Sequence, residues 1–451
     1  MHGFRRIRKT PPTEVQAAAG CKHVMGLENF GGHDMSNVLE NKWMRAAVPA
    51  LLIHCSIGTV YCWSSFSGAL AKQVGTSPAL IGFAFSLAIF FLGMSAAFAG
   101  PFIERNIHKA SLIACLCFTA GMAGTGLCIR YSTMLGTGLT TAGIFLFYGC
   151  IMGIGLGIGY LTPVKTLMLW FKDNPGLGTG ISIMGFGLAK AIASPVMNTL
   201  QGRIGLANMF FVLTGVYFLM MMLGHFLLKK PEGWVEPQVK NTVNRLKLFR
   251  NKTYAGIWLM FYINITCGLA LISYEKPILQ LAGFGMAAIS VVQSLTAASN
   301  ALGRIGFSTF SDHLKDRNSV YKTIFLLCIG TAAAAFAVSA VSKGILAVVF
   351  ILLLVVNAGY GGGFSTLPAL LSSRFGMKNI STNHGVALSA WAFAGLSGNQ
   401  LTALILRMTG SYETVIIVLA GLYLIAFLIA QFVVGTEEQE LCVPSGAASA
   451  E

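Results

Sequence analysis

Long apolar runs, separated by short polar segments, fill the chain between residues 46 and 434. A helix that crosses a bilayer needs about 20 predominantly apolar residues, and the runs predict twelve such helices. The alternation of a barrel strand is absent, and the runs are too long for one. We therefore expect an all-α integral membrane protein. The predicted spans are 46–66, 79–100, 110–130, 143–169, 177–201, 208–228, 255–275, 286–308, 321–341, 346–372, 384–406 and 413–434.

The composition indicates the same class. Of the 451 residues, 55% are hydrophobic and only 10% are charged, and the mean hydropathy is +0.70. Soluble globular proteins of this length do not have such a composition. The lipid bilayer is therefore an expected partner of most of the chain.

The net charge of +15 follows the loops and does not form the continuous basic surface of a nucleic-acid-binding protein. Basic residues concentrate in alternate loops, and the loops between them hold single charges. Because cytoplasmic loops carry an excess of Lys and Arg, this bias predicts a multi-pass protein of the cell (inner) membrane with both termini and segment 229–252 in the cytoplasm. The basic loops hold Arg105 and Lys109, Lys172, Lys229 through Lys252, Lys315, Arg317 and Lys322, and Arg374 and Lys378.

Eight of the ten cysteines lie in or beside the predicted spans, where cysteine acts as a small apolar residue. Cys115 and Cys117 are two positions apart and point to different faces of a helix, which does not favour a metal site. The chain has no Walker loop, zinc motif or nucleophile elbow. We expect no cofactor, no metal and no enzyme activity.

The chain repeats itself in two halves. GPFIERNIHKAS follows the second span, and GFSTFSDHLKDRNSVYK follows the eighth. Each segment places a glycine, an acid and basic residues in a short cytoplasmic loop. We expect two pseudo-symmetric six-helix halves, 43–228 and 253–436, joined by the cytoplasmic linker 229–252. The matched loops are candidates for gating the cytoplasmic side, although solvated loops can carry such charges by chance; their residues are Gly100, Glu104, Arg105, Asp312 and Arg317.

The first 42 residues are basic at their start and lack the hydrophobic core of a signal peptide, so they predict a cytoplasmic tail. MSNVLENKWMR, which begins at Met35, would be an ordinary short lead into the first span, and Met35 is a candidate for the true start. A disordered tail and an organellar transit peptide are the alternatives. Residues 437–451 are expected to form the C-terminal cytoplasmic tail.

Arg304 lies inside the eighth predicted span, AAISVVQSLTAASNALGRIGF. A guanidinium keeps its proton there, and a charge at bilayer depth costs at least about 2.5–3.5 kcal/mol. The acidic residues fall in tails, loops or span ends, with Glu275 nearest to an interior, and no carboxylate is evident to neutralise the span cations Arg304, Lys190 and Lys165. We therefore expect Arg304 to attract an anion, or else to pair with a backbone carbonyl and only brace the helices.

Gln293, Asn300 and Arg304 share one face of that helix, which should line a cavity between the halves. Lys190 is either a second anion contact or a solvated structural residue, and Lys165 is more simply a lysine that reaches toward the membrane surface. His54 is a candidate proton carrier, although a lone histidine in an apolar helix is more often only hydrogen-bonded. The aromatic candidates for the cavity wall, which packing would also explain, are Tyr61, Trp63, Tyr360, Phe364 and Trp391.

Several motifs together resemble the oxalate:formate antiporter family, bacterial relatives of the monocarboxylate transporters in the major facilitator superfamily. They are GTVYCWSSF, WFKDNPGLGTGISIMGFG, NALGR with a following SD, and NHGVALSAWAFAGLSG. The resemblance implies that Tyr61 and Trp63 form the family's YxW and that Arg304 binds a substrate carboxylate. The family's oxalate transporter pairs that arginine with a lysine in span 11, where this chain has Trp391. One fixed cation suits a monocarboxylate better than oxalate.

The sequence thus favours a monomeric secondary transporter of small organic anions, of the formate, lactate or pyruvate type, that works by alternating access as a proton symporter or an anion exchanger. An exporter of drugs or other solutes with the same fold is one alternative, but it would need a membrane carboxylate for a cationic substrate. A sensor that binds a carboxylate without moving it is another, but the tails are short for an output domain.

The charge bias makes a topological prediction. Reporter fusions or cysteine labels at residues 240 and 445 should report the cytoplasmic side, because both positions belong to the basic set of segments. Labelling of either position by an impermeant reagent added outside intact cells would contradict the twelve-span arrangement.

Overall fold

The structure is a computed structural model that describes residues 41–234, 245–339 and 345–435. The tail before residue 41, with Met35, therefore lies outside the described residues, as do 235–244 of the linker and the C-terminal tail. Within the described ranges the chain is helical and contains no strand. The predicted all-α class is confirmed.

The first half runs from η1 to α9. Its first span is divided among four short helices, and α6, η3 and α7 follow one another as one long helical segment with a kink at Gly136. The elements are η1 (Trp43–Ala47), α2 (Val48–Ile57), η2 (Gly58–Cys62), α3 (Trp63–Val74), α4 (Pro78–Arg105), α5 (Ile107–Arg130), α6 (Ser132–Ile144), η3 (Phe145–Met152), α7 (Gly153–Trp170), α8 (Pro175–Ile204) and α9 (Leu206–Leu227).

The second half runs from α11 to η4 and follows the short helix α10 (Arg245–Leu248). Its elements are α11 (Lys252–Ser273), α12 (Glu275–Leu281), α13 (Met286–Ser311), α14 (Asn318–Ser339), α15 (Ile345–Phe375), α16 (Ile380–Thr409), α17 (Tyr412–Leu428) and η4 (Ile429–Val434).

Ten helical segments within the described residues are long and apolar enough to cross a membrane. α13 and α16 have 26 and 30 residues and carry more polar side chains. With these two, each of the twelve predicted spans falls on a long helix. Several boundaries differ from the prediction. The second span ends at Arg105, and the fourth lies on a helical segment that begins at Ser132. The first span continues past residue 66 to Val74 through a 3₁₀ turn, and the seventh ends at Ser273, so that Glu275 opens a separate short helix.

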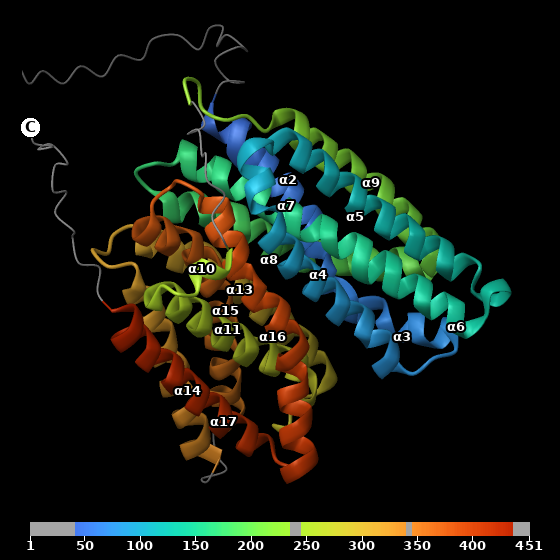
Figure 1. Ribbon diagram of the computed structural model, residues 1–451. Helices are drawn as coiled ribbons and strands as arrows, with labels where there is room; N and C mark the ends of the chain where they lie inside the picture. The colour runs from blue at the N-terminus through green and yellow to red at the C-terminus, as the bar shows by residue number, and fades with distance from the viewer. Residues whose placement is uncertain (1–40, 235–244, 340–344, 436–451) are drawn as a thin grey trace, which may run out of the picture.

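Figure 1 shows the halves as two bundles, blue to green and yellow to red. They meet along two helix pairs, because α4 packs along α16 and α8 packs along α13. Glycines let these helices approach closely. An added Cβ at Gly100 would lie 2.6 Å from the Cα of Thr382, and one at Gly176 would lie 2.0 Å from the carbonyl oxygen of Ser308.

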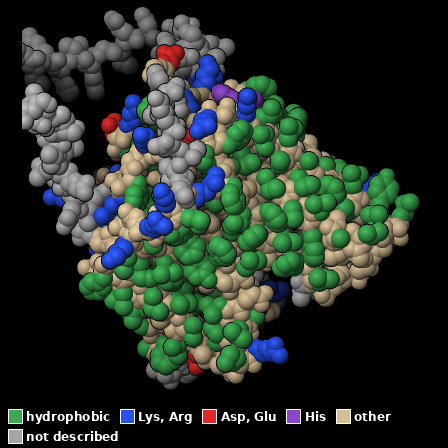
Figure 2. All heavy atoms as spheres, viewed as in Figure 1, with side chains coloured by type: hydrophobic (Ala, Val, Ile, Leu, Met, Phe, Trp, Pro, Cys, Tyr) green, Lys and Arg blue, Asp and Glu red, His purple; other side chains and the backbone are tan. Residues whose placement is uncertain are grey.

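Large apolar side chains cover the flanks of the bundles, as Figure 2 shows. Leu139, Phe226 and Phe432 are 67%, 67% and 77% exposed, which suits contact with lipid tails. Lys and Arg gather toward one end of the face in view. We call this the basic end; it includes a surface hollow lined by Arg105, Asn106, Ile107, His108, Lys109, Lys229 and Lys230.

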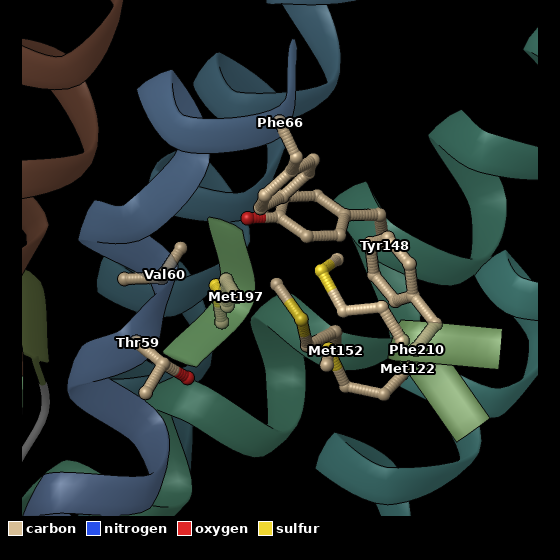
Figure 3. Close-up of a pocket in the computed structure, with 9 residues that line it drawn as sticks. Thr59, Val60, Phe66, Met122, Tyr148, Met152, Met197 and Phe210 are labelled. Atoms are coloured by element: carbon tan, nitrogen blue, oxygen red, sulfur yellow. The ribbon is translucent and has the colours of Figure 1, made fainter. Parts of the chain in front are cut away.

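The interior of the first half is filled by apolar side chains. Figure 3 shows a void there, lined by the methionines 122, 152, 197 and 209 with aromatic neighbours. Its volume of about 10 Å³ is no more than one water molecule needs. It is a packing defect and not a ligand site.

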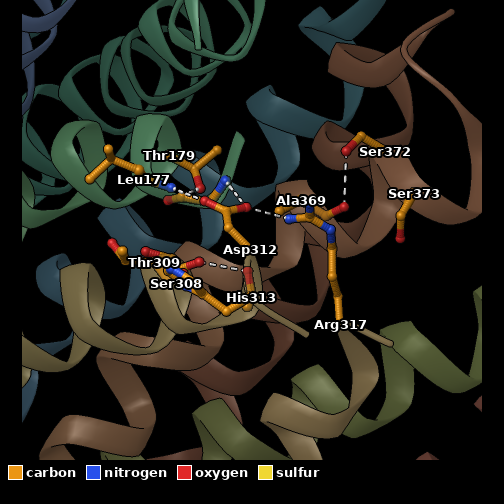
Figure 4. A network of polar contacts seen from close by, with 12 residues as sticks. Leu177, Thr179, Ser308, Thr309, Asp312, His313, Arg317, Ala369, Ser372 and Ser373 are labelled. Atoms are coloured by element: carbon orange, nitrogen blue, oxygen red, sulfur yellow. Dashed lines mark hydrogen bonds and ion pairs between the residues drawn. The ribbon is translucent and has the colours of Figure 1, made fainter. Parts of the chain in front are cut away.

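Two buried carboxylates hold the halves together at the basic end. Asp312, just after α13, accepts hydrogen bonds from the backbone N–H groups of Gly176 (2.9 Å) and Leu177 (2.8 Å), and Arg317 donates to it at 2.7 Å (Figure 4). The two carboxylate oxygens of Asp312 thus lie at the N-terminus of α8, whose first N–H groups have no partner within the helix. A charged carboxylate at that position is stabilising.

A carboxylate of the first half makes the corresponding contact with a helix N-terminus of the second half. Glu104, near the end of α4, accepts from the backbone N–H of Ser381 at 2.6 Å, at the N-terminus of α16. Lys165 forms a buried ion pair with the same carboxylate. Glu104 and Asp312, the acids matched between the two repeated loops, therefore both make contacts across the halves. Arg105, by contrast, is exposed and has no hydrogen bond or ion pair with a described residue.

This arrangement predicts that Asp312→Asn loosens the basic end. The change removes the negative charge that binds the α8 N-terminus, and hydrogen bonds to a charged group contribute about 1.5–3 kcal/mol each. A cysteine introduced at the buried Ser308 should react with a maleimide about tenfold faster or more in the Asp312→Asn background. Glu413→Gln, which alters an exposed carboxylate at the start of α17, is the matched control. Equal rates in all three backgrounds would contradict the role of Asp312.

Candidate functional site

A cavity of about 370 Å³ lies between the halves, away from the basic end. It reaches the surface beside the exposed residues Ser273 and Lys276, just past the end of α11. A volume of this size fits a small organic molecule. Its wall combines residues of both halves: Tyr61, Trp63, Phe85, Gly187, Lys190, Leu269, Ile272, Ser273, Glu275, Lys276, Gln293, Thr296, Ala297, Asn300, Asn357 and Tyr360.

Arg304 lies just beneath the floor of this cavity and is fully buried. Its Nε donates to the Asn300 side-chain oxygen at 2.9 Å, and one terminal nitrogen, Nη1, donates to the Ile183 carbonyl of α8 at 3.4 Å. The second terminal nitrogen, Nη2, has no hydrogen-bond partner among the described residues. The Ile183 contact is the backbone pairing that a bracing role predicts, but it leaves part of the guanidinium unsatisfied.

Two glycines make room for the guanidinium between α8 and α15. An added Cβ at Gly187 would lie 3.0 Å from Arg304 Nε, and one at Gly361 would lie 3.0 Å from Arg304 Cγ. Because Gly187 and Asn300 also line the cavity, they join Arg304 to it.

Aromatic rings surround the same cation. The guanidinium carbon lies 5.3 Å from the centroid of the Phe364 ring and 5.8 Å from that of Phe186, within the range of cation–π attraction. Trp391 is fully buried behind Phe364, with ring centroids 4.5 Å apart. Phe364 and Trp391 are not among the residues that line the cavity, and their ring contacts are the packing that the sequence analysis gave as the alternative to a place in its wall.

The hydroxyls of Tyr61 and Tyr360 join the halves above Arg304. They lie 3.0 Å apart, one from the η2 segment and one from α15. Both tyrosines and Trp63 line the cavity, as do Asn300 and Gln293. The structure thus places these five predicted residues together, and their role in binding stays a prediction.

Lys190 also lines the cavity, half-buried on α8, and no hydrogen bond or ion pair joins its ammonium to a described residue. It faces a carboxylate that sequence reasoning did not place there. Glu275 is 4% exposed and belongs to the same wall. The expectation that no carboxylate lies near the span cations was therefore wrong, because the chain bends at Tyr274 and turns Glu275 inward.

Lys165 is not part of this site. It is buried at the basic end and paired with Glu104. The expectation that it reaches toward the membrane surface was wrong, because the partner carboxylate comes from α4, 61 residues earlier in the chain. A pair at such a distance in sequence depends on helix packing, which the apolar pattern does not reveal.

His54 is fully buried on α2, outside the cavity wall. Its ring nitrogens lie 2.6 Å from the Ser182 carbonyl oxygen and 3.0 Å from the Tyr160 carbonyl oxygen. The imidazole thus ties α2 to α7 and α8. This is the hydrogen-bonded role expected of a lone histidine, and proton transfer by His54 stays a prediction.

Thr296, Asn357 and Glu275 line the cavity, although the sequence analysis did not expect them there. Thr296 and Asn357 are ordinary polar residues in apolar helices, and Glu275 lies at a predicted span end. Thr296 follows Gln293 by three positions on α13, so the helical pattern that selected Gln293 and Asn300 could have found it. Asn357 precedes Tyr360 by three positions on α15 in the same way.

The comparisons with known proteins agree on the family. The sequence profile of the Major Facilitator Superfamily matches residues 50–399. Among curated proteins, the chain is 25% identical over 357 residues to the uncharacterized MFS-type transporter YhjX of Escherichia coli (strain K12), covering 78% of this chain and 85% of that one. It is 23% identical over 404 residues to the oxalate:formate antiporter of Oxalobacter formigenes, with 88% and 93% covered. It is 20% identical over 469 residues to the apicoplast pyruvate carrier 1 of Toxoplasma gondii, with 80% and 83% covered.

Solved structures show the same fold. The proton:xylose symporter XylE superposes with a TM-score of 0.69 at 14% identity, covering 86% of this chain and 95% of that one. An outward-facing bacterial homologue of the iron transporter ferroportin gives 0.67 at 13% identity, with 85% and 97% covered. The resemblance to the oxalate:formate antiporter family that the motifs predicted is confirmed by the curated relatives. This chain belongs to the major facilitator superfamily and is a multi-pass membrane transporter.

Proposed function

We propose that this protein moves small monocarboxylates across a membrane by alternating access. The observation that supports this most is the buried Arg304 guanidinium, which has one nitrogen without a hydrogen-bond partner among the described residues and contacts Asn300, a residue of the cavity wall between the halves. A carboxylate is the ligand that such a planar group binds best, through two parallel hydrogen bonds. Two relatives, an oxalate:formate antiporter and a pyruvate carrier, are also named for carboxylates.

The charges of the cavity favour a single negative charge on the substrate. Lys190 and Glu275 belong to the same wall and offset each other. Lys276 is exposed at the mouth, where water screens it. Arg304 is then the fully buried cation of the site whose charge no described carboxylate offsets, and it matches one substrate carboxylate. A cationic drug would meet an arginine and a lysine here, which argues against the exporter alternative.

The orientation follows from the basic end. If the excess of Lys and Arg marks the cytoplasmic side, the contacts of Glu104 and Asp312 close the cytoplasmic end, and the cavity faces outward. Substrate would enter between Lys190 and Glu275 and reach Arg304. The cytoplasmic contacts would then have to separate to release it, as the rocking of two halves around a central site requires.

Arg304 is the most direct test of this proposal. Arg304→Lys keeps the charge but loses the two-pronged donor, so uptake of labelled formate, lactate or pyruvate into proteoliposomes should fall about 10- to 100-fold. Arg304→Ala should abolish it. Arg203→Ala, an exposed arginine at the end of α8, is the matched control and should transport normally.

A bracing role for Arg304 predicts a different result. Arg304→Ala would then lower the amount of folded protein in the membrane, while the surviving molecules transport at the normal rate per molecule. That outcome would remove Arg304 from the substrate site and, with it, the main support for a carboxylate carrier.

The tryptophan at position 391 allows a second test, on substrate charge. Its ring packs 6.5 Å from that of Tyr61 and 4.5 Å from that of Phe364, so a lysine there would place a second cation near Arg304. Oxalate should be a poor substrate of the unmodified protein, and Trp391→Lys should shift the preference from monocarboxylate toward oxalate. Trp391→Phe keeps the site apolar and should not shift it. Oxalate exchange as fast as pyruvate exchange by the unmodified protein would contradict this prediction.

A further inference from the structure

Glu275 combines three features that the proposed function does not yet use. It is 4% exposed, it lines the cavity, and no ion pair joins it to a described residue. A buried carboxylate without a cation at contact distance is unfavourable in its charged form. Such a group is neutralised either by a partner that arrives or by a proton.

The hydrogen bonds around Thr296 favour neutralisation of Glu275 by a proton. The Thr296 hydroxyl oxygen lies 2.5 Å from Glu275 Oε1 and 3.0 Å from the Gln293 carbonyl oxygen. A hydroxyl has one hydrogen, so it can donate to only one of these two acceptors at a time. Both contacts are satisfied together if the Glu275 carboxyl is protonated: its O–H donates to Thr296, and the Thr296 O–H donates to Gln293.

The surroundings agree with this arrangement. Burial raises the pKa of the Glu275 carboxyl, while the positive charge of Lys190 acts in the opposite direction. The titratable groups of the shared wall are Lys190 on α8, Lys276 on α12 and Tyr61 and Tyr360 on η2 and α15; α11 and α13 contribute no charged side chain to it. The half-buried Lys190 is therefore the cation that interacts with the negative charge of Glu275, and this interaction is lost when Glu275 is protonated.

We propose that Glu275 is a proton-binding residue of the transport cavity, and that the protein takes up one proton with each monocarboxylate. This inference rests on the proposed function. A proton from the solution outside adds to an Oε of Glu275, which removes the negative charge facing Lys190. The substrate carboxylate then enters beside Lys190 and Arg304 without meeting another carboxylate. The proton leaves Glu275 for water once the cavity opens to the other side.

The charge balance of the cycle supports this coupling. With Arg304 and Lys190 charged and Glu275 ionised, the three groups sum to one positive charge. Adding one proton and one monocarboxylate leaves that sum unchanged. The empty and loaded cavities therefore carry the same charge, so that reorientation of the loaded protein exposes no additional unpaired charge to the low-dielectric interior.

The test compares two transport modes in proteoliposomes. Exchange is measured as counterflow of labelled pyruvate between equal concentrations at equal pH. Proton uptake is measured as acidification of the lumen, with a trapped pH-sensitive dye, when pyruvate is added outside. Protein-free vesicles give the baseline for passive permeation of pyruvic acid.

The unmodified protein should show both exchange and lumenal acidification. Glu275→Gln mimics the protonated carboxyl, so it should exchange pyruvate within about threefold of the unmodified rate and show acidification only at the protein-free baseline. Glu413→Gln removes an exposed carboxylate at the start of α17, outside the cavity, and should behave as the unmodified protein in both assays.

Thr296→Val provides a second measurement in case Glu275→Gln does not fold. The valine can no longer accept the hydrogen bond that the protonated carboxyl donates to Thr296. The protonated form of Glu275 is therefore destabilised, and the external pH at which uptake is half-maximal should shift downward. No shift would count against the proposal.

Each contrary result contradicts a different part of the proposal. Full acidification in Glu275→Gln overturns the role of Glu275, and its loss in His54→Gln instead would assign the proton to His54. Exchange without acidification in the unmodified protein overturns proton coupling and leaves the monocarboxylate function standing. Loss of exchange in a folded Glu275→Gln makes Glu275 a substrate-binding group and contradicts the proposal. Absence of both activities in the unmodified protein removes the proposed function itself.

Discussion

The buried charge of Arg304 is the constraint on which the rest of this structure depends. A guanidinium stays protonated in any protein environment, and this one is fully buried between the two halves. The fold accommodates it with glycines at positions 187 and 361, with the Asn300 amide and with the faces of two phenylalanine rings. One of its nitrogens still lacks a hydrogen-bond partner in the part of the chain that the structure describes. A site that keeps a cation incompletely satisfied is suited to an anion that binds and leaves.

The two ends of the molecule differ in how the halves meet. At the basic end, Glu104 and Asp312 each hold the N-terminus of a helix from the opposite half. These contacts are few, charge-assisted and concentrated at helix ends, so that they can form or separate as a unit. At the other end the halves leave a cavity, whose wall places Lys190 and Glu275 above Arg304. Closing one end and opening the other requires only that the halves rock about the glycine-lined contacts of α4 with α16 and α8 with α13.

Sequence reasoning predicted the helices and one face of the cavity well because both depend on local patterns. Apolar runs of sufficient length form spans wherever they occur, and Gln293, Asn300 and Arg304 share a face by helical periodicity alone. The pairing of Glu104 with Lys165 and the position of Asp312 at the start of α8 depend on which helices pack together, which no local pattern encodes. The inward turn of Glu275 follows from a bend after Ser273, and Trp391 packs against Phe364 outside the cavity wall, a contact between helices that no local pattern encodes.

The central claim is that Arg304 binds a substrate carboxylate, and ligand-induced thermal stabilisation tests it most directly. A ligand that binds only the folded protein raises its unfolding temperature in proportion to its occupancy. Pyruvate, titrated into the purified protein in detergent, should raise the unfolding midpoint of the unmodified protein and of Arg203→Ala and leave that of Arg304→Ala unchanged. An equal rise in Arg304→Ala would show that the carboxylate binds elsewhere and would contradict this account.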